Sequence, residues 1–188
     1  MNERAVAELV AQLTRIAYGD GFTEGLTPAQ WTALRYFARA NRFSRTVSAF
    51  AEYHATTRGT ASQTVKGLVK NGYLTRTRSE RDRRSISFEL TEASHALLAA
   101  DPFERLVAAA AGLSNTSRQA TCRALDRMLR VLAEEHGRNV FGMCPNCKYL
   151  RTGVCCQSNL TEYQCDFVKE SLTSAEIDQL CINFSHAR

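Results

Sequence analysis

The sequence predicts a mainly α-helical protein with one small β-hairpin, an α+β fold, followed by a short cysteine-rich appendage. Apolar residues recur at helical spacing in several segments before residue 138, whereas two short runs between residues 73 and 90 alternate with a period of two. Six of the seven cysteines lie beyond residue 143. We therefore expect one domain over residues 1–140 and a separate metal-binding extension over residues 141–188.

The bulk composition is that of an ordinary folded domain, since 44% of the 188 residues are hydrophobic and 23% are charged. Glu3, Arg4 and Glu8 interrupt the region in which a secretory signal peptide needs an apolar run. No segment approaches the ~18–20 apolar residues of a membrane span. These absences predict a cytoplasmic protein with no membrane partner. Residues 1–138 carry a net charge of +6 and residues 139–188 one of −1, and the basic first part suits a nucleic-acid partner.

Apolar periodicity and capping signals indicate the first three helices. The first covers residues 2–18 and is amphipathic. The second begins at Thr27, with Pro28 in its first position and Gln30 placed to complete a capping box. It is expected to run to about residue 40, and a third helix follows at about residues 46–54. The residues expected to face inward are Trp31, Leu34, Phe37 and Ala38 in the second helix and Val47, Phe50 and Ala51 in the third.

A short helix and a hairpin come next. Thr57 is suited to cap the helix, and Asn71-Gly72 supplies a left-handed stop at its end. Runs with a period of two over residues 73–78 and 85–90 predict two strands joined by the charged turn 79–84.

Two further helices complete the domain. One begins at Thr91 and is expected to reach about Ala111, with a kink at Asp101-Pro102. The last is capped by Ser114 or Asn115 and ends near residue 137. The apolar stripes of the first and last helices exceed what a small core needs, so they predict a dimer interface. These stripes consist of Val6, Leu9, Leu13 and Ile16, and of Leu125, Met128, Leu129 and Leu132.

This order of elements is that of a winged helix-turn-helix. The short helix presents small polar side chains that can hydrogen-bond to base edges in the major groove. The hairpin carries arginines that can enter the minor groove or neutralise phosphates. The candidate DNA-binding residues of the helix are Thr57, Arg58, Thr60, Ser62, Gln63 and Lys66, and the arginines of the hairpin are Arg76, Arg78, Arg81, Arg83 and Arg84.

The segments that carry a family resemblance are Leu26–Trp31, Arg58–Val65, Lys70–Leu74, the wing signature Asp82-Arg83-Arg84, and Leu90-Thr91. Together they resemble the MarR family of winged-helix regulators. The resemblance implies a homodimer that binds a pseudo-palindromic operator, usually as a repressor. It also implies that Asp82 braces the wing, that Arg84 is its main DNA contact and that Arg83 lies near its tip. Ser94, where the family commonly has glycine, and the long tail depart from its pattern.

The cysteine-rich extension indicates metal or redox chemistry, because structural disulfides are rare in reducing compartments. Cys144-x2-Cys147 can direct two thiolates to one metal, and two further cysteines would complete a four-thiolate set. We expect four ligands among Cys144, Cys147, Cys155, Cys156 and Cys165, with Cys181 as a further candidate in a terminal helix over residues 174–184. Which of the adjacent Cys155 and Cys156 is a ligand stays open, as does the choice between an iron–sulfur cluster, zinc and a metal-free thiol switch.

These observations favour a DNA-binding transcriptional regulator whose tail senses iron or redox state through an iron–sulfur cluster. The alternative is a regulator that responds to a small aromatic ligand and carries structural zinc in its tail. An enzyme is not expected, because no nucleophile triad, carboxylate pair or phosphate-binding loop accompanies the cysteines. Cys122 is interpreted as an inert residue of the last long helix, and His136 as a minor candidate for the metal site.

Overall fold

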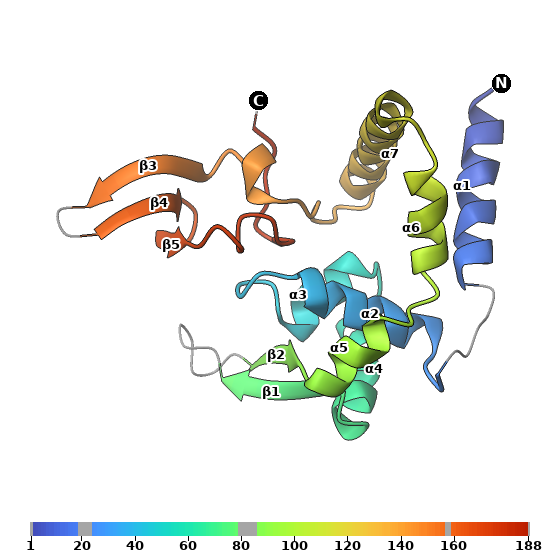
Figure 1. The fold of residues 1–188 in the computed structure, drawn as a ribbon, viewed down its shortest axis with the longest axis horizontal. Coiled ribbons are helices and arrows are strands. Elements are labelled where there is room, and N and C mark those ends of the chain that lie inside the picture. The colour runs from blue at the N-terminus through green and yellow to red at the C-terminus, as the bar shows by residue number, and fades with distance from the viewer. Residues whose placement is uncertain (1, 19–23, 79–85, 157–158, 188) are drawn as a thin grey trace.

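The computed structural model describes residues 2–18, 24–78, 86–156 and 159–187. Figure 1 shows a helical domain from which a small three-stranded sheet extends on one side. Among the described residues, no helix combines the length and the apolar character needed to cross a membrane. The elements are α1 (Glu3–Tyr18), α2 (Pro28–Arg39), α3 (Val47–Tyr53), α4 (Arg58–Lys70), β1 (Leu74–Arg78), β2 (Ile86–Leu90), α5 (Glu92–Leu98), α6 (Glu104–Ala111), α7 (Asn115–Glu135), the 3-10 turn η1 (Cys144–Asn146), β3 (Leu150–Cys156), β4 (Asn159–Cys165) and β5 (Glu170–Leu172).

The predicted capping box at the start of α2 is confirmed. The Thr27 hydroxyl accepts the Gln30 N–H at 3.2 Å, and the Gln30 side-chain oxygen accepts the Thr27 N–H at 2.9 Å. Both groups would otherwise be unpaired at a helix start. The box therefore fixes where α2 begins, and with it which residues of α2 face the core.

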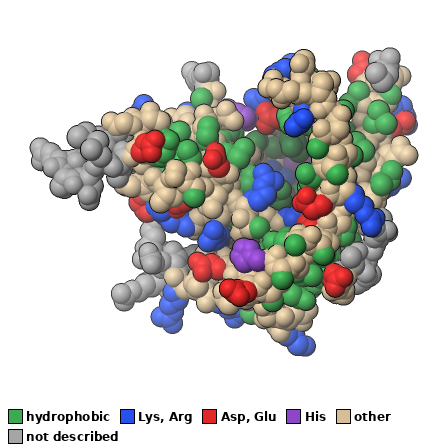
Figure 2. All heavy atoms as spheres, in the orientation of Figure 1, with side chains coloured by type: hydrophobic (Ala, Val, Ile, Leu, Met, Phe, Trp, Pro, Cys, Tyr) green, Lys and Arg blue, Asp and Glu red, His purple; other side chains and the backbone are tan. Residues whose placement is uncertain are grey.

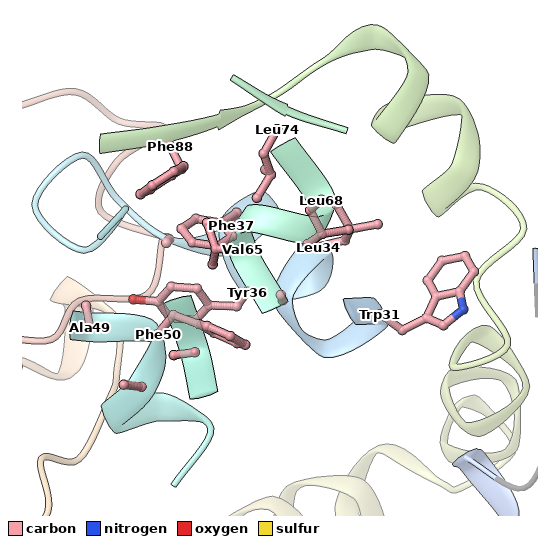
Figure 3. Packing of buried hydrophobic residues seen from close by; sticks show 14 of the residues in the cluster. Trp31, Leu34, Tyr36, Phe37, Ala49, Phe50, Val65, Leu68, Leu74 and Phe88 are labelled. Carbon is pink, nitrogen blue, oxygen red and sulfur yellow. The ribbon is translucent and has the colours of Figure 1, made fainter. Parts of the chain in front are cut away.

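The core forms where α2, α3, α4 and the hairpin meet (Figure 3). Phe37 lies at its centre, with ring centroids 5.8 Å from Phe50 of α3 and 5.8 Å from Phe88 of β2. One prediction was wrong here: Ala38 is exposed, whereas Tyr36 is buried. Trp31, Leu34 and Phe37 are buried as predicted, and the buried face extends to Tyr36, whose ring lies 5.5 Å from that of Phe50 in α3.

The two predicted strands are confirmed. Leu74 pairs with Leu90 and Arg78 with Ile86, in antiparallel fashion. Gly72, between α4 and β1, has a φ of +75°, which confirms the predicted left-handed stop. The turn itself falls in residues 79–85, outside the described part of the chain.

The segment expected to be one kinked helix consists of two separate helices, α5 and α6. Pro102 lies between them, and the buried carboxylate of Asp101 accepts two hydrogen bonds from Arg35 of α2, at 2.8 and 3.0 Å. It also accepts the Phe103 N–H at 2.9 Å. The break between α5 and α6 is therefore tied to α2.

α1, α6 and α7 lie together at one side of the molecule (Figure 1). α1 contacts α6, and Ser114 caps α7 through its side chain, as predicted. The apolar stripes of α1 and α7 stay exposed: Leu9 is 51% and Leu129 is 65% exposed. A single chain therefore leaves uncovered the surfaces that the sequence assigns to a dimer interface.

The tail forms an antiparallel sheet with the strand order β3-β4-β5, which sequence analysis did not predict. The helix expected over residues 174–184 is absent from the structure; that segment forms turns and isolated bridges. Its backbone pairs with other segments instead, because Leu180 bridges Ala40 and Cys181 bridges Gly142.

Removal of the Asp101 carboxylate should destabilise the domain. Asp101→Ala leaves the guanidinium of Arg35, whose side chain is only 16% exposed, without this partner. Loss of one member of such a buried pair typically costs about 3–5 kcal/mol. Urea unfolding at a fixed protein concentration measures the change. Glu8→Ala, which breaks the exposed Arg4–Glu8 pair, is the control and should alter stability by less than about 1 kcal/mol. Equal effects of the two substitutions would contradict this role of Asp101.

Candidate nucleic-acid interface and cysteine cluster

α4 has one buried apolar face and one exposed polar face. Ala61, Val65 and Leu68 are buried against α2 and α3 (Figure 3). Of the predicted DNA-binding residues of this helix, Ser62 is half-buried and the others are exposed; these are Thr57, Arg58, Thr60, Gln63 and Lys66. A rigidly held helix with donors and acceptors on its free face can enter a major groove.

Thr57 has a structural role at the start of α4. Its hydroxyl accepts the Thr60 N–H at 3.2 Å and lies 2.9 Å from the Thr60 hydroxyl. Thr57 is therefore the predicted N-cap, and two of the predicted DNA-binding hydroxyls are already paired with each other. Arg58, Gln63 and Lys66 remain as the long exposed side chains of this face.

The hairpin places Arg76 and Arg78 on β1, next to α4, and both side chains are exposed. Arg81, Arg83 and Arg84, together with Asp82, lie outside the described residues. Arg45, in the connection between α2 and α3, was missed by sequence analysis. Its carbonyl accepts the Phe88 N–H at 2.9 Å, and its guanidinium lies 3.8 Å from Glu89. It attaches β2 to the helical part, a role that no local signal indicates.

The tail brings four of its cysteines to one region. Cys144 and Cys181 are buried, and Cys147 and Cys165 are half-buried. Burial, together with the nearby Cys181, Cys147 and Cys165, raises the pKa of the Cys144 thiol to about 12. The Cys147 N–H donates to the Cys144 carbonyl and the Cys181 N–H to the Gly142 carbonyl, so the main chains of these cysteines lie close together.

The thiols do not meet at a single point in this structure. Among the residues that the structure describes, no three histidine, cysteine or acidic side chains are arranged to hold a metal ion. Cys155 and Cys156 pair with Leu160 and Asn159 at the far end of the β3–β4 hairpin. The β3–β4 register thus separates these two predicted ligands from Cys165, which pairs with Leu150 at the near end.

The two remaining candidates lie elsewhere on the molecule. Cys122 is exposed on α7, and His136 forms the C-cap of that helix. His136 lines a cavity of about 400 Å³ between α3, α7 and the segment that follows α7. Figure 2 shows a hollow between the tail and α7 on this face. Its apolar walls include Tyr53, Leu132 and Phe141.

The tail is attached to the connection between α2 and α3. Leu180 donates its N–H to the Arg39 carbonyl at 2.7 Å and accepts the Asn41 N–H at 2.9 Å. The Ile182 N–H donates to the buried Ser44 hydroxyl at 2.9 Å. On the surface, Arg42 pairs with Glu170 at 3.1 Å and with Glu176 at 2.5 Å. The cysteine-rich extension is therefore packed against the connection between α2 and α3.

The comparisons with known proteins agree with this fold. A model of the MarR family matches residues 24–85. A comparison with curated protein sequences finds no significant match. The solved structures that resemble the chain include an S. aureus MepR–DNA complex, with 18% identity over 70% of this chain and 96% of that chain and a TM-score of 0.57.

Two other structures have similar scores. Streptococcus pneumoniae FabT in complex with DNA has 17% identity over 71% of this chain and 99% of that chain, with a TM-score of 0.54. A MarR transcriptional regulator from Methanosarcina mazei Go1 has 22% identity over 70% of this chain and 99% of that chain, with a TM-score of 0.53. The chain thus has the winged helix-turn-helix fold of MarR-type structures.

Proposed function

We propose that this chain is a cytoplasmic, sequence-specific DNA-binding transcriptional regulator of the MarR type, acting as a homodimer and most simply as a repressor. The observation that carries the proposal is α4, whose apolar face is fixed in the core while Arg58, Gln63 and Lys66 are exposed. The hairpin that follows adds Arg76 and Arg78 beside it. Two similar structures, of MepR and FabT, are complexes with DNA, which supports the same use of this fold.

α4 and the hairpin would have different tasks. Glutamine can bind adenine and arginine can bind guanine through paired hydrogen bonds, so α4 would determine which sequence is bound. The arginines of the turn, Arg81, Arg83 and Arg84, would bind phosphates or the minor groove and so determine how tightly any DNA is bound.

A dimer would double the length of sequence that is contacted. One winged helix contacts few base pairs, whereas two copies one helical turn apart multiply specificity. The exposed apolar stripes of α1 and α7 lie at the same side of the molecule (Figure 1), which supports their burial against a second copy.

The tail would give this regulator its signal. We propose that its cysteines bind an iron–sulfur cluster and that loss or oxidation of the cluster changes operator affinity. The supporting observation is that backbone contacts hold Cys144, Cys147, Cys165 and Cys181 in one part of a tail attached to the α2–α3 connection. The second candidate is a regulator that binds a small aromatic ligand and carries structural zinc. The apolar cavity beside Tyr53 and Phe141 is the specific observation in its favour.

Substitutions on α4 and in the turn should affect DNA binding differently. The probes are a duplex that the wild-type protein selects from a random library and a duplex of scrambled sequence. Gln63→Ala should weaken binding to the selected duplex by about 5- to 150-fold and leave the scrambled one unchanged. Arg84→Ala should weaken both and reduce the salt dependence by about one released ion. Arg4→Ala removes the same charge from α1 as a control. If both variants behaved like Arg4→Ala, this surface would not bind DNA.

A charge placed in either apolar stripe should separate the dimer. Leu9→Glu and Leu129→Glu would each bury a carboxylate in the proposed interface, which is unfavourable without a partner charge. Sedimentation velocity should show a change from the dimer mass to the monomer mass. Gln119→Glu on α7 adds the same charge outside the stripe and should remain dimeric. Wild-type protein at the monomer mass would contradict the proposed dimer.

Metal analysis distinguishes the two candidate functions. Protein purified without oxygen should be brown and contain iron and acid-labile sulfide. A colourless protein with zinc would favour the second candidate, in which case an aromatic ligand should bind in the cavity. A protein without any metal would contradict both proposals for the tail.

A further inference from the structure

We propose that Cys144, Cys147, Cys165 and Cys181 together hold one metal centre. We further infer that Cys181 ties this centre to the connection between α2 and α3. The inference rests on the proposed metal-binding role of the tail and adds two things: the ligand set, and the route by which metal binding reaches the DNA-binding unit.

Three backbone contacts bring the four cysteines together. In η1, the Cys147 N–H donates to the Cys144 carbonyl at 2.8 Å, the kind of tight turn in which a C-x2-C pair can bind one metal. The Cys181 N–H donates to the Gly142 carbonyl at 3.0 Å, two residues before Cys144. The Leu150 N–H donates to the Cys147 carbonyl at 3.2 Å, and Leu150 pairs with Cys165 across the sheet. Each contact involves main chain, so the backbone holds the four cysteines near one another, and metal binding would require only that their side chains turn towards one point.

The same sheet register excludes Cys155 and Cys156 from this set. Cys155 is five residues along β3 from Leu150, the partner of Cys165. At the usual rise of a strand this is a separation of about 16 Å. A cysteine sulfur binds zinc at about 2.3 Å, so one ion cannot join both ends of the hairpin. The proposed set therefore contains Cys181 and omits Cys155 and Cys156, whereas spacing alone favoured these two over Cys181.

A buried nitrogen without a partner is the second observation that points to a ligand here. His186 forms an antiparallel bridge with Cys147, and residues directly opposite in such a bridge have neighbouring side chains. Its Nε2 is buried and has no hydrogen-bond partner among the residues that the structure describes. Buried polar atoms are rarely left in this way. A thiolate bound to a metal carries the negative charge that an imidazole N–H can donate to, and metal sites commonly use such partners.

Cys181 also belongs to the segment that attaches the tail. Leu180, just before it, bridges Ala40, and Ile182, just after it, donates to the Ser44 hydroxyl. The Cys181 thiol itself is hydrogen-bonded to the Asn41 side chain. Coordination of Cys181 would therefore fix a three-residue segment whose members all contact the connection between α2 and α3. Metal binding at thiolates is coupled to folding, so loss of the metal would loosen this attachment.

Matched cysteine variants test the ligand set. The full-length protein is purified without oxygen, and iron, sulfide and zinc are measured for each variant. Most of the metal should be lost in each of four single variants: Cys144→Ser, Cys147→Ser, Cys165→Ser and Cys181→Ser. The Cys155→Ser/Cys156→Ser double variant and Cys122→Ser should keep the wild-type content. Full metal in Cys181→Ser, or its loss in the double variant, would overturn the assignment. Wild-type protein without metal would instead contradict the proposed function of the tail.

Two variants that leave all cysteines in place test the route. Ser44→Ala removes the acceptor of the Ile182 N–H. Arg42→Ala removes the ion pairs with Glu170 and Glu176 that attach the tail to the same connection. In the wild type, removal of the metal with a chelator should change affinity for the selected duplex by about 5-fold or more. Both variants should keep their metal but respond less than about 2-fold. A full response in both would show that the signal takes another route.

Discussion

The structure depends on one short backbone segment, residues 39–45, which connects α2 to α3 and is shared by three parts of the molecule. On one side, the Arg45 carbonyl accepts the Phe88 N–H and so attaches the hairpin. On the other, Arg39 and Asn41 exchange backbone hydrogen bonds with Leu180 of the tail. The Tyr36 hydroxyl donates to the Ser44 carbonyl at 2.6 Å from within the core. Because each of these groups is paired, the segment can be buried without an unsatisfied donor or acceptor.

The side chains of this segment form a buried polar network that includes a group from the tail. Asn41 and Ser44 are buried and hydrogen-bonded to each other at 2.7 Å. Burial, together with the nearby Tyr53 and Cys181, raises the pKa of Tyr36 well above its ordinary value, so its hydroxyl remains a donor. A buried network favours one arrangement only when every member is satisfied. The tail supplies the Ile182 N–H to this network, so its departure would leave the buried Ser44 hydroxyl with one partner fewer.

Sequence reasoning succeeded where the signal was local and failed where the partner was distant. The residues that cap or end helices lie within three residues of their partners, and they were predicted correctly. They are Thr27, Gln30, Thr57, Gly72 and Ser114. The helix predicted over residues 174–184 was wrong because Leu180 and Cys181 take their hydrogen bonds from Arg39, Asn41 and Gly142. The same limit applies to the cysteines: their spacing indicates a metal site, but only the β3–β4 register separates Cys155 and Cys156 from the others.

The tail is held at both ends, and this determines what a signal in it can do. It leaves α7 covalently, and Phe141 then packs against Tyr36 and Tyr53, with ring centroids 6.1 and 5.3 Å apart. It returns to the α2–α3 connection through Leu180. The tail therefore connects α7, the helix proposed for dimerisation, to the unit proposed to bind DNA. The 400 Å³ cavity lies between α3, α7 and the start of the tail. A metal at the cysteines and an aromatic molecule in the cavity would both act next to Leu180, which lines the cavity and directly precedes Cys181. The two candidate functions thus differ in the chemistry of the signal, but both would act through the attachment of the tail at Leu180.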